Sequence, residues 1–326
     1  MIPLVAPTIT GHDRGYLRQR IADGLLDDES EVRRFEEKFA ERVGCKGAVA
    51  VCSGTVALEL ALQVLDVGAV SIPTYSCVAL RNATRRNAVT YLDSTFRVKD
   101  AQMTTPIRSG GAIVVHMFGK QTHVGLGSGE YLVEDFTLSL GGIECLIGRI
   151  GVCSTHASKM ISTGRGGVVF SNDLHLLHEV RRLAYYETHT GTAHSYGMSS
   201  TQAALGVSQL AQLDAFIERR RTLAWRYSDA FEPAGIECPD PDCGSVFFRY
   251  MIAVDDPAGK VAQLAERGIE AGRGVNPLLH QLAGISDDRF PGAVNDWHRL
   301  LSVPVHLSIT DVEAAYIAAQ VVEVCA

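Results

Sequence analysis

The sequence of 326 residues lacks several features, and each absence excludes a class of protein. It holds only 11 prolines and 21% charged residues, a composition that argues against a disordered or fibrous chain. No apolar run approaches the ~18 residues that a membrane-spanning helix needs, so we expect no membrane contact. The net charge of -7 argues against a nucleic-acid partner, and we expect the basic run 219–221 to be a solvated helix face.

Cysteine is present, but not in a pattern that binds metal. Cys52 and Cys153 lie in apolar, strand-like runs, where a free thiol behaves as a small hydrophobic side chain. Cys238 and Cys243 bracket a Pro-Asp-Pro-Asp turn without a second Cys/His pair at zinc spacing. The first ten residues lack the charged segment and apolar segment of a secretory signal. We therefore expect a cytoplasmic protein with free thiols and no metal.

Short β-branched runs alternate with amphipathic stretches over the first two thirds of the chain. The runs cover residues 48–52, 70–73, 89–93, 112–116, 131–135, 150–154 and 167–170. Apolar strands joined by helix-length connections predict an α/β fold with a mainly parallel, seven-stranded sheet and helices on both faces. Ligands of such sheets bind where the strands end, so the residues just after each run are the first candidates for a site.

Helical patterns frame this sheet and suggest two domains. Apolar residues recur every three or four positions from Glu29 to Val43, which predicts an amphipathic helix there. The Ala- and Leu-rich stretch 199–231 predicts one long connecting helix. We expect a large domain over 1–231 and a smaller α+β domain over 232–326. The smaller domain offers a strand-like run at 246–254, an amphipathic stretch at 257–267 and a final helix from Thr310.

Three local patterns follow predicted strands and suggest chemistry. Ser53-Gly54-Thr55 opens an apolar helix, and the N-terminus of a helix binds phosphate through its unpaired N–H groups. The same tripeptide is equally what an ordinary helix start would use. Asp135 ends the run 131–135, where a carboxylate can pair with a protonated ring nitrogen, or can simply cap a helix or lie in a loop.

The third pattern is the run Ser154-Thr155-His156-Ala157-Ser158 followed by Lys159. The turn Gly164-Arg165-Gly166-Gly167 comes next. A lysine that bonds a cofactor aldehyde must have its pKa lowered by burial or by nearby positive charge. An isolated lysine lies far more often on the surface, so only the combination of the three patterns is informative.

In this order and at this spacing, the patterns resemble the DegT/StrS family of sugar aminotransferases, which use pyridoxal 5'-phosphate (PLP) and have the aspartate aminotransferase fold. The resemblance covers nearly the whole chain. Its further elements are Phe35-Glu36, Ile72-Pro73-Thr74-Tyr75, Val115-His116-Met117-Phe118-Gly119, Pro277-Leu278-Leu279-His280 and Leu301-Ser302-Val303-Pro304-Val305-His306.

The resemblance implies a role for each matched residue. Lys159 holds PLP as a Schiff base and moves the proton during the reaction, and Asp135 faces the ring nitrogen. The phosphate is held by Ser53, Gly54, Thr55, the amide of Val56, and Ser154. His156, His280 and Tyr75 are candidate substrate residues. The family forms two-fold dimers in which an Asn of one subunit reaches the phosphate of the other, and Ser195 stands at that position here.

Three departures from the family pattern point to a remodelled pocket. Leu138 replaces a Gln or His that lies near the phenolic oxygen of PLP, and Cys77 replaces a broader side chain on the ring. The run Ser195-Tyr196-Gly197-Met198 lacks the Arg of the family's Asn-Tyr-Arg-Met element.

We therefore expect an aminotransferase that moves an amino group from glutamate or glutamine to a keto sugar or related biosynthetic ketone. Two alternatives stay open. One is another PLP-dependent reaction at Cα, such as elimination or racemisation. The other is a regulatory or structural protein that keeps the fold without catalysis, because a fold alone does not establish an activity.

Overall fold

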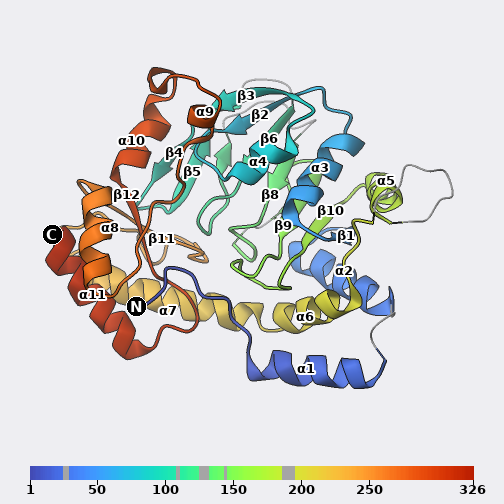
Figure 1. Ribbon diagram of the computed structural model, residues 1–326, viewed down its shortest axis with the longest axis horizontal. Coiled ribbons are helices and arrows are strands. Elements are labelled where there is room, and N and C mark those ends of the chain that lie inside the picture. The colour runs from blue at the N-terminus through green and yellow to red at the C-terminus, as the bar shows by residue number, and fades with distance from the viewer. Residues whose placement is uncertain (25–28, 108–110, 125–131, 143–144, 186–194) are drawn as a thin grey trace.

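A seven-stranded sheet forms the centre of the computed structural model, which describes residues 1–24, 29–107, 111–124, 132–142, 145–185 and 195–326. Its order is β1-β10-β9-β8-β6-β2-β3 (Figure 1). The strands are β1 Gly47–Val51, β2 Ala69–Pro73, β3 Ala88–Leu92, β6 Gly111–Val115, β8 Leu132–Asp135, β9 Ile150–Ser154 and β10 Gly167–Ser171. Only β10 pairs antiparallel with its neighbours, so the predicted mainly parallel sheet is confirmed. Tyr131, the first residue of one predicted strand, lies outside the described residues.

Successive residues of a strand point to opposite faces of the sheet, and β1 shows the consequence. Val49 and Val51 join the apolar cluster under α3 (Gly54–Val64), α4 (Val78–Ala83) and α5 (Leu174–Ala184). Ala48 and Ala50 join the cluster under α2 (Glu29–Val43) and α6 (Ser200–Leu210). Helices therefore cover both faces, as the apolar runs predicted.

A two-stranded antiparallel sheet organises the C-terminal part of the chain. It pairs β11 (Tyr250–Ala253) with β12 (Leu300–Val303). Helices α8 (Pro257–Glu266) and α11 (Asp311–Cys325) pack with it and with the second half of α7 (Leu213–Phe231) around one apolar cluster (Figure 1). The division into domains at residue 231 stays a prediction.

The C-terminal part is also tied to the large sheet region. Helix α10 (Pro291–Arg299) packs on β4 (Thr95–Arg97), and Asp93 accepts the N–H groups of Gly292 and Ala293 at 3.0 and 2.7 Å. The short helices α9 (Leu279–Leu282) and η3 (Asp287–Arg289) precede α10. At the other end of the chain, α1 (Gly11–Ala22) lies against α6.

Several sequence predictions need correction. The single helix over 199–231 is two helices, α6 and α7, with a break at residues 211–212. The side chains of Gln209 and Gln212 beside this break both donate to the buried Asp13 of α1 (2.6 and 2.9 Å). The strand over 246–254 is shorter, β11 alone, and the left-handed φ of 46° at Phe247 interrupts the extended backbone before it.

Two further differences concern the basic run and an additional small sheet. Arg220 of the basic run is buried rather than solvated, since its Nη1 donates to the carbonyls of Phe247, Phe248 and Val305 (3.3, 3.3 and 2.5 Å). A small sheet of β4 (Thr95–Arg97), β5 (Gln102–Thr105) and β7 (His123–Val124) was not predicted. In the described part of the chain, no helix is long and apolar enough to span a membrane.

Candidate functional site

A cavity of about 330 Å³ lies at the carboxyl edge of the large sheet. Strands β1, β8 and β9 end at this edge, and β10, which runs in the opposite direction, begins there. Eight of the residues predicted from the sequence line the cavity: Ser53, Gly54, Thr55, Cys77, Asp135, Ser154, His156 and Lys159. Residues from distant parts of the sequence are therefore brought together at one end of the sheet, as expected for an open α/β sheet.

The N-terminus of α3 forms one end of the cavity. Ser53 caps the helix, and its Oγ accepts the N–H of Val56 at 3.2 Å. The N–H groups of Gly54 and Thr55 lie in the first turn and have no partner inside the helix. A Cβ at Gly54 would lie 2.5 Å from the Cβ of Ser154, so only glycine fits where α3 approaches β9. These N–H groups and the helix dipole suit a phosphate.

Asp135 lies at the end of β8 and supplies a buried carboxylate. It is 5% exposed, and its Oδ1 accepts the N–H of Thr137 at 2.9 Å. Burial raises the pKa of the Asp135 carboxyl above its ordinary value, although the hydrogen bonds from Thr137 and the positive charge of Lys159 act to lower it. A buried carboxylate with free lone pairs is the chemistry that a protonated ring nitrogen requires.

Lys159 lies in the turn after β9, where its N–H donates to the carbonyl of His156 at 2.9 Å. Its ammonium lies 5.5 Å from the centre of the Phe248 ring. Burial lowers the pKa of Lys159 below its ordinary value, Cys77 and Asp135 act to raise it, and the guanidinium of Arg249 lowers it further. A lysine with a lowered pKa carries a larger fraction of free amine at neutral pH, which is the form that bonds an aldehyde.

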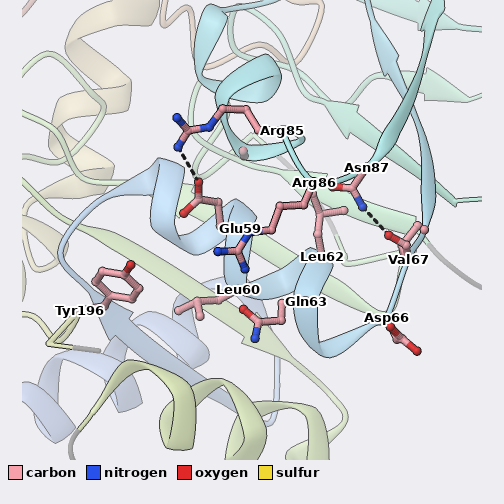
Figure 2. Close-up of a pocket in the computed structure, with 12 residues that line it drawn as sticks. Glu59, Leu60, Leu62, Gln63, Asp66, Val67, Arg85, Arg86, Asn87 and Tyr196 are labelled. Atoms are coloured by element: carbon pink, nitrogen blue, oxygen red, sulfur yellow. Dashed lines mark hydrogen bonds and ion pairs between the residues drawn. The ribbon is translucent and has the colours of Figure 1, made fainter. Parts of the chain in front are cut away.

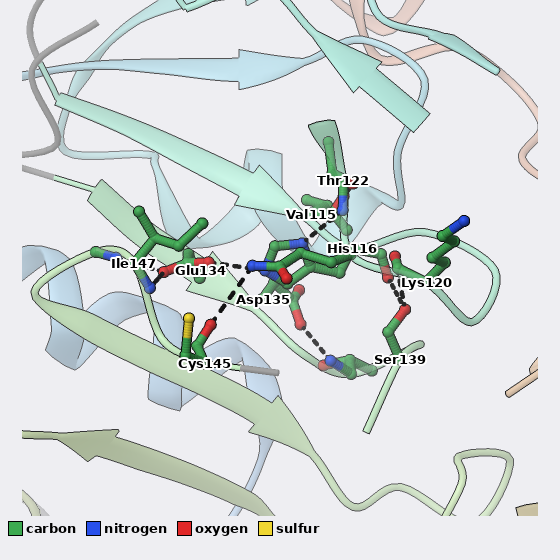
Figure 3. A network of polar contacts seen from close by, with 12 residues as sticks. Val115, His116, Lys120, Thr122, Glu134, Asp135, Ser139, Cys145 and Ile147 are labelled. Carbon is green, nitrogen blue, oxygen red and sulfur yellow. Dashed lines mark hydrogen bonds and ion pairs between the residues drawn. The ribbon is translucent and has the colours of Figure 1, made fainter. Parts of the chain in front are cut away.

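A buried polar network holds the strand ends around Asp135 (Figure 3). Glu134, on the other face of β8, accepts Nε2 of His116 at 3.0 Å, and its second oxygen accepts the N–H groups of Ile147 and Gly148. Nδ1 of His116 accepts the N–H of Thr122 at 3.0 Å, which leaves Nε2 to donate to Glu134. The N–H of His116 donates to the carbonyl of Asp135 at 3.0 Å, which links this network to the site.

Four predicted residues lie at the edge of the cavity or outside it. Cys77 is exposed at the N-cap position of α4, where its side chain makes no capping bond. His156 is also exposed, with Nδ1 at 3.1 Å from the hydroxyl of Ser158. The amide of Val56 is already bonded to Ser53. Ser195 is exposed and does not line the cavity of its own chain.

Tyr75 and His280, the other two candidate substrate residues, are fully buried and do not line the cavity. His280 lies between the hydroxyl of Thr74 (2.6 Å) and the carboxylate of Asp287 (2.7 Å), and its ring stacks on Phe290. These contacts describe a histidine that joins segments of the fold, and its role in substrate binding stays a prediction.

The cavity is also lined by five residues to which no role was assigned from the sequence, namely Leu58, Ala79, Thr137, Arg165 and Gly166. The hydroxyl of Thr137 accepts the N–H of Ser154 at 2.8 Å and so joins β8 to β9. Arg165 is exposed in the turn before β10 and adds a positive charge to the cavity lining. Their positions could have indicated them, because Thr137 lies two residues after Asp135 and Arg165 lies within the Gly-rich turn after Lys159.

A larger groove of about 570 Å³ lies toward the far end of α3 and is lined by none of the predicted site residues (Figure 2). Arg85 pairs with Glu59 at 3.5 Å, and the amide of Asn87 donates to the carbonyl of Val67. Tyr196 also borders this groove. The groove lining holds no lysine and no buried carboxylate among the described residues, so its size does not make it the catalytic site.

The fold and the smaller cavity define the class of protein, a transferase that uses PLP. Comparison with known proteins agrees. The model of the DegT/DnrJ/EryC1/StrS aminotransferase family matches residues 7–322. EpsN of Bacillus subtilis (strain 168), a putative PLP-dependent aminotransferase by its name, is 30% identical over 312 residues, which cover 83% of this chain and 80% of EpsN.

Two further relatives cover almost the whole chain. The dTDP-4-dehydro-2,3,6-trideoxy-D-glucose 4-aminotransferase of Saccharopolyspora spinosa is 28% identical over 367 residues, covering 98% of this chain and 95% of the relative. The crystal structure of the aminotransferase TlmJ from Streptoalloteichus hindustanus matches with a TM-score of 0.86 and 25% identity. The match covers 99% of this chain and 98% of TlmJ. The chain belongs to the DegT/DnrJ/EryC1/StrS aminotransferase family. It is a PLP-dependent aminotransferase of the aspartate aminotransferase fold.

Proposed function

We propose that this enzyme transfers an amino group from an amino acid, glutamate or glutamine, to a keto sugar or a related biosynthetic ketone. One observation carries the proposal: Lys159, with its lowered pKa, and the buried carboxylate of Asp135 share a single cavity with the N-terminus of α3. The name of the Saccharopolyspora spinosa relative supports the keto-sugar acceptor.

The residues of the cavity fit PLP from end to end. When bound, PLP supplies an aldehyde that condenses with amines and a ring that withdraws electrons from the Cα–H bond of the substrate. The N-terminus of α3, with Ser53, Gly54 and Thr55, would hold the phosphate, and Ser154 beside Gly54 would add a hydroxyl. Asp135 would keep the ring nitrogen protonated.

Lys159 has two tasks in this proposal. Its Nζ would bond the cofactor between turnovers, and after an amine has displaced it, the free Nζ would move the proton between Cα of the substrate and C4′ of the cofactor. Burial of the ammonium favours the neutral amine that both tasks need.

Conversion of the cofactor tests the function directly. Holoenzyme incubated with single amino acids should change from the absorbance of PLP to that of pyridoxamine phosphate, fastest with glutamate or glutamine. Release of the matching keto acid in equal amount would exclude elimination and racemisation, which leave the cofactor as PLP. If no amino acid converts the cofactor, the aminotransferase proposal is wrong.

We also propose that the active unit is a two-fold homodimer with shared sites. The segment 195–198 runs along the end of β1, where the N–H of Cys52 donates to the carbonyl of Tyr196 at 2.7 Å. Ser195 itself is exposed at the start of this segment, where it can face a neighbouring subunit. A two-fold axis makes such an exchange reciprocal, so both sites would form together.

Sedimentation at micromolar concentration tests the dimer, and a monomer that retains PLP tightly would contradict it. Replacing Ser195 by Ala should weaken PLP retention without dissociating the dimer, because only one hydroxyl is lost. Identical retention would leave Ser195 as an ordinary loop residue.

A further inference from the structure

Three cationic side chains surround the ring of Phe248, which is 7% exposed. The ammonium of Lys159 lies 5.5 Å from the ring centre, and the guanidinium carbons of Arg249 and Arg220 lie 5.6 and 5.9 Å from it. One of the three is the lysine of the proposed reaction. The other two do not line the cavity, but the charge of Arg249 acts on Lys159.

The two arginines differ in how their charge is satisfied. Nη1 of Arg220 donates to three carbonyl oxygens, so this guanidinium holds the backbone together. Nη1 of Arg249 is buried and makes no hydrogen bond to any residue that the structure describes. Within the same part of the chain, no carboxylate lies within ion-pair distance of Arg249. A buried donor on a cation without an acceptor is costly, so Nη1 of Arg249 requires an explanation, and a bound ligand is one.

The carboxylate whose charge acts on Arg249, that of Glu270, does not form an ion pair with it. Glu270 acts on Arg249 through its charge, but Glu270 is exposed and its Oε2 accepts the N–H of Leu4 at 3.0 Å. Arg249 is held in place instead by its own backbone, whose N–H donates to the carbonyl of Phe118 at 3.2 Å, and it directly precedes β11. The guanidinium therefore lies close enough to Lys159 for its charge to lower the pKa of the lysine, and its buried Nη1 lacks an acceptor that a bound anion could supply.

We propose that Arg249 binds the α-carboxylate of the amino-acid donor beside Lys159. The planar guanidinium matches a carboxylate with two parallel N–H donors, whereas a keto sugar ring carries hydroxyls that do not need a full positive charge. With its carboxylate at Arg249, the donor would have its amine near Nζ of Lys159. This assignment rests on the proposed aminotransferase function and names the residue that selects its donor.

The test compares four holoenzymes: the unchanged protein, Arg249→Met, Arg249→Lys and Arg273→Met. Arg273 is the matched control, because it too has a buried Nη1 without a partner among the described residues, but it stacks on Trp297 at 3.8 Å. Cofactor conversion is followed against the concentration of L-glutamate and of its α-amide, which lacks the carboxylate charge. A melting temperature and the borohydride-fixed cofactor confirm that each variant is folded and loaded.

Arg249→Met should raise the half-saturating concentration of L-glutamate on the order of 100-fold, as expected for a lost hydrogen bond to a charged group, and leave that of the α-amide unchanged. The half-saturating concentration of L-glutamate for Arg249→Lys should lie between those of the unchanged protein and of Arg249→Met. Arg273→Met should behave as the unchanged protein. An unchanged response to L-glutamate in Arg249→Met, an equal loss in Arg273→Met, or a loss confined to the ketone half of the reaction would each overturn the assignment.

A calorimetric titration with succinate separates this assignment from the proposed function. Succinate has carboxylates but no amine, so it binds whether or not the protein transfers amino groups. If no amino acid converts the cofactor, the aminotransferase proposal fails, yet succinate should still bind the unchanged holoenzyme and bind Arg249→Met at least ~10-fold more weakly. Equal binding to both proteins, or no binding to either, would overturn the role of Arg249.

Discussion

Replacing Asp135 by Asn removes one charge from the cavity and almost nothing else. The side chain keeps its shape and size, and the oxygen of the new amide can still accept the N–H of Thr137, which lies 2.9 Å from Oδ1 of Asp135 in the structure. The network of Glu134 and His116 holds the backbone of Asp135, so the strand end should not move. The variant therefore tests the charge of Asp135 rather than its position.

The size of the effect follows from burial. Asp135 is 5% exposed, so its partner on the cofactor cannot exchange the lost carboxylate for water. Breaking a buried pair by removing one charge costs about 3–5 kcal/mol. If this loss falls on the transition state for Cα–H removal, at about 1.4 kcal/mol per factor of ten, the rate should fall about 10²- to 10⁴-fold.

Single-turnover absorbance with a saturating amino acid measures that rate without the ketone half of the reaction. A suitable control is Asp296→Asn, because Asp296 is also a buried carboxylate (2% exposed) but accepts the N–H of Phe96 at 2.5 Å, away from the cavity lining. The control should lose stability and keep its rate once folded. Asp135→Asn with an unchanged rate would refute the assigned role of this carboxylate.

Two further predictions concern stability and cofactor retention. Burial lowers the pKa of Lys159, so the folded apoprotein binds fewer protons than the unfolded chain between that pKa and the ordinary lysine value. The contribution of Lys159 to the stability of the apoprotein should therefore rise with pH across this window, and Lys159→Met should remove that contribution from the pH dependence measured in denaturant titrations; an identical slope would contradict the shift. Gly54→Ala should weaken PLP binding at least ~10-fold by equilibrium dialysis, because its Cβ would lie 2.5 Å from the Cβ of Ser154 and must displace α3. Gly68→Ala, with open space at its Cβ, is the control, and equal PLP binding by both variants would contradict the close packing.

Local patterns in the sequence were sufficient wherever one physical cause dominated. The stripe that includes Phe35 and Phe39 predicted α2 with its observed bounds, because burial of one helix face decides that segment. The strand ends also carried the site, since Ser53, Asp135 and Ser154 each follow or end an apolar run at the same sheet edge.

The remaining features depend on partners that are distant in the sequence. Arg220 reads as a surface residue, but three carbonyls from the segments 247–248 and 305 converge on it. The strands β4, β5 and β7 hold four residues or fewer, which is too short for a period to be recognised. Arg249 was missed for the same reason: nothing near it in the sequence indicates that its neighbour Phe248 packs beside Lys159.

The most direct test of the central claim is to locate the bond between the cofactor and the protein. Purified protein supplied with PLP is reduced with borohydride, digested, and mapped by mass spectrometry. We predict a single phosphopyridoxyl adduct on Lys159 and its complete absence from Lys159→Ala. An adduct on another lysine, or a PLP absorbance band that survives in Lys159→Ala, would contradict the account.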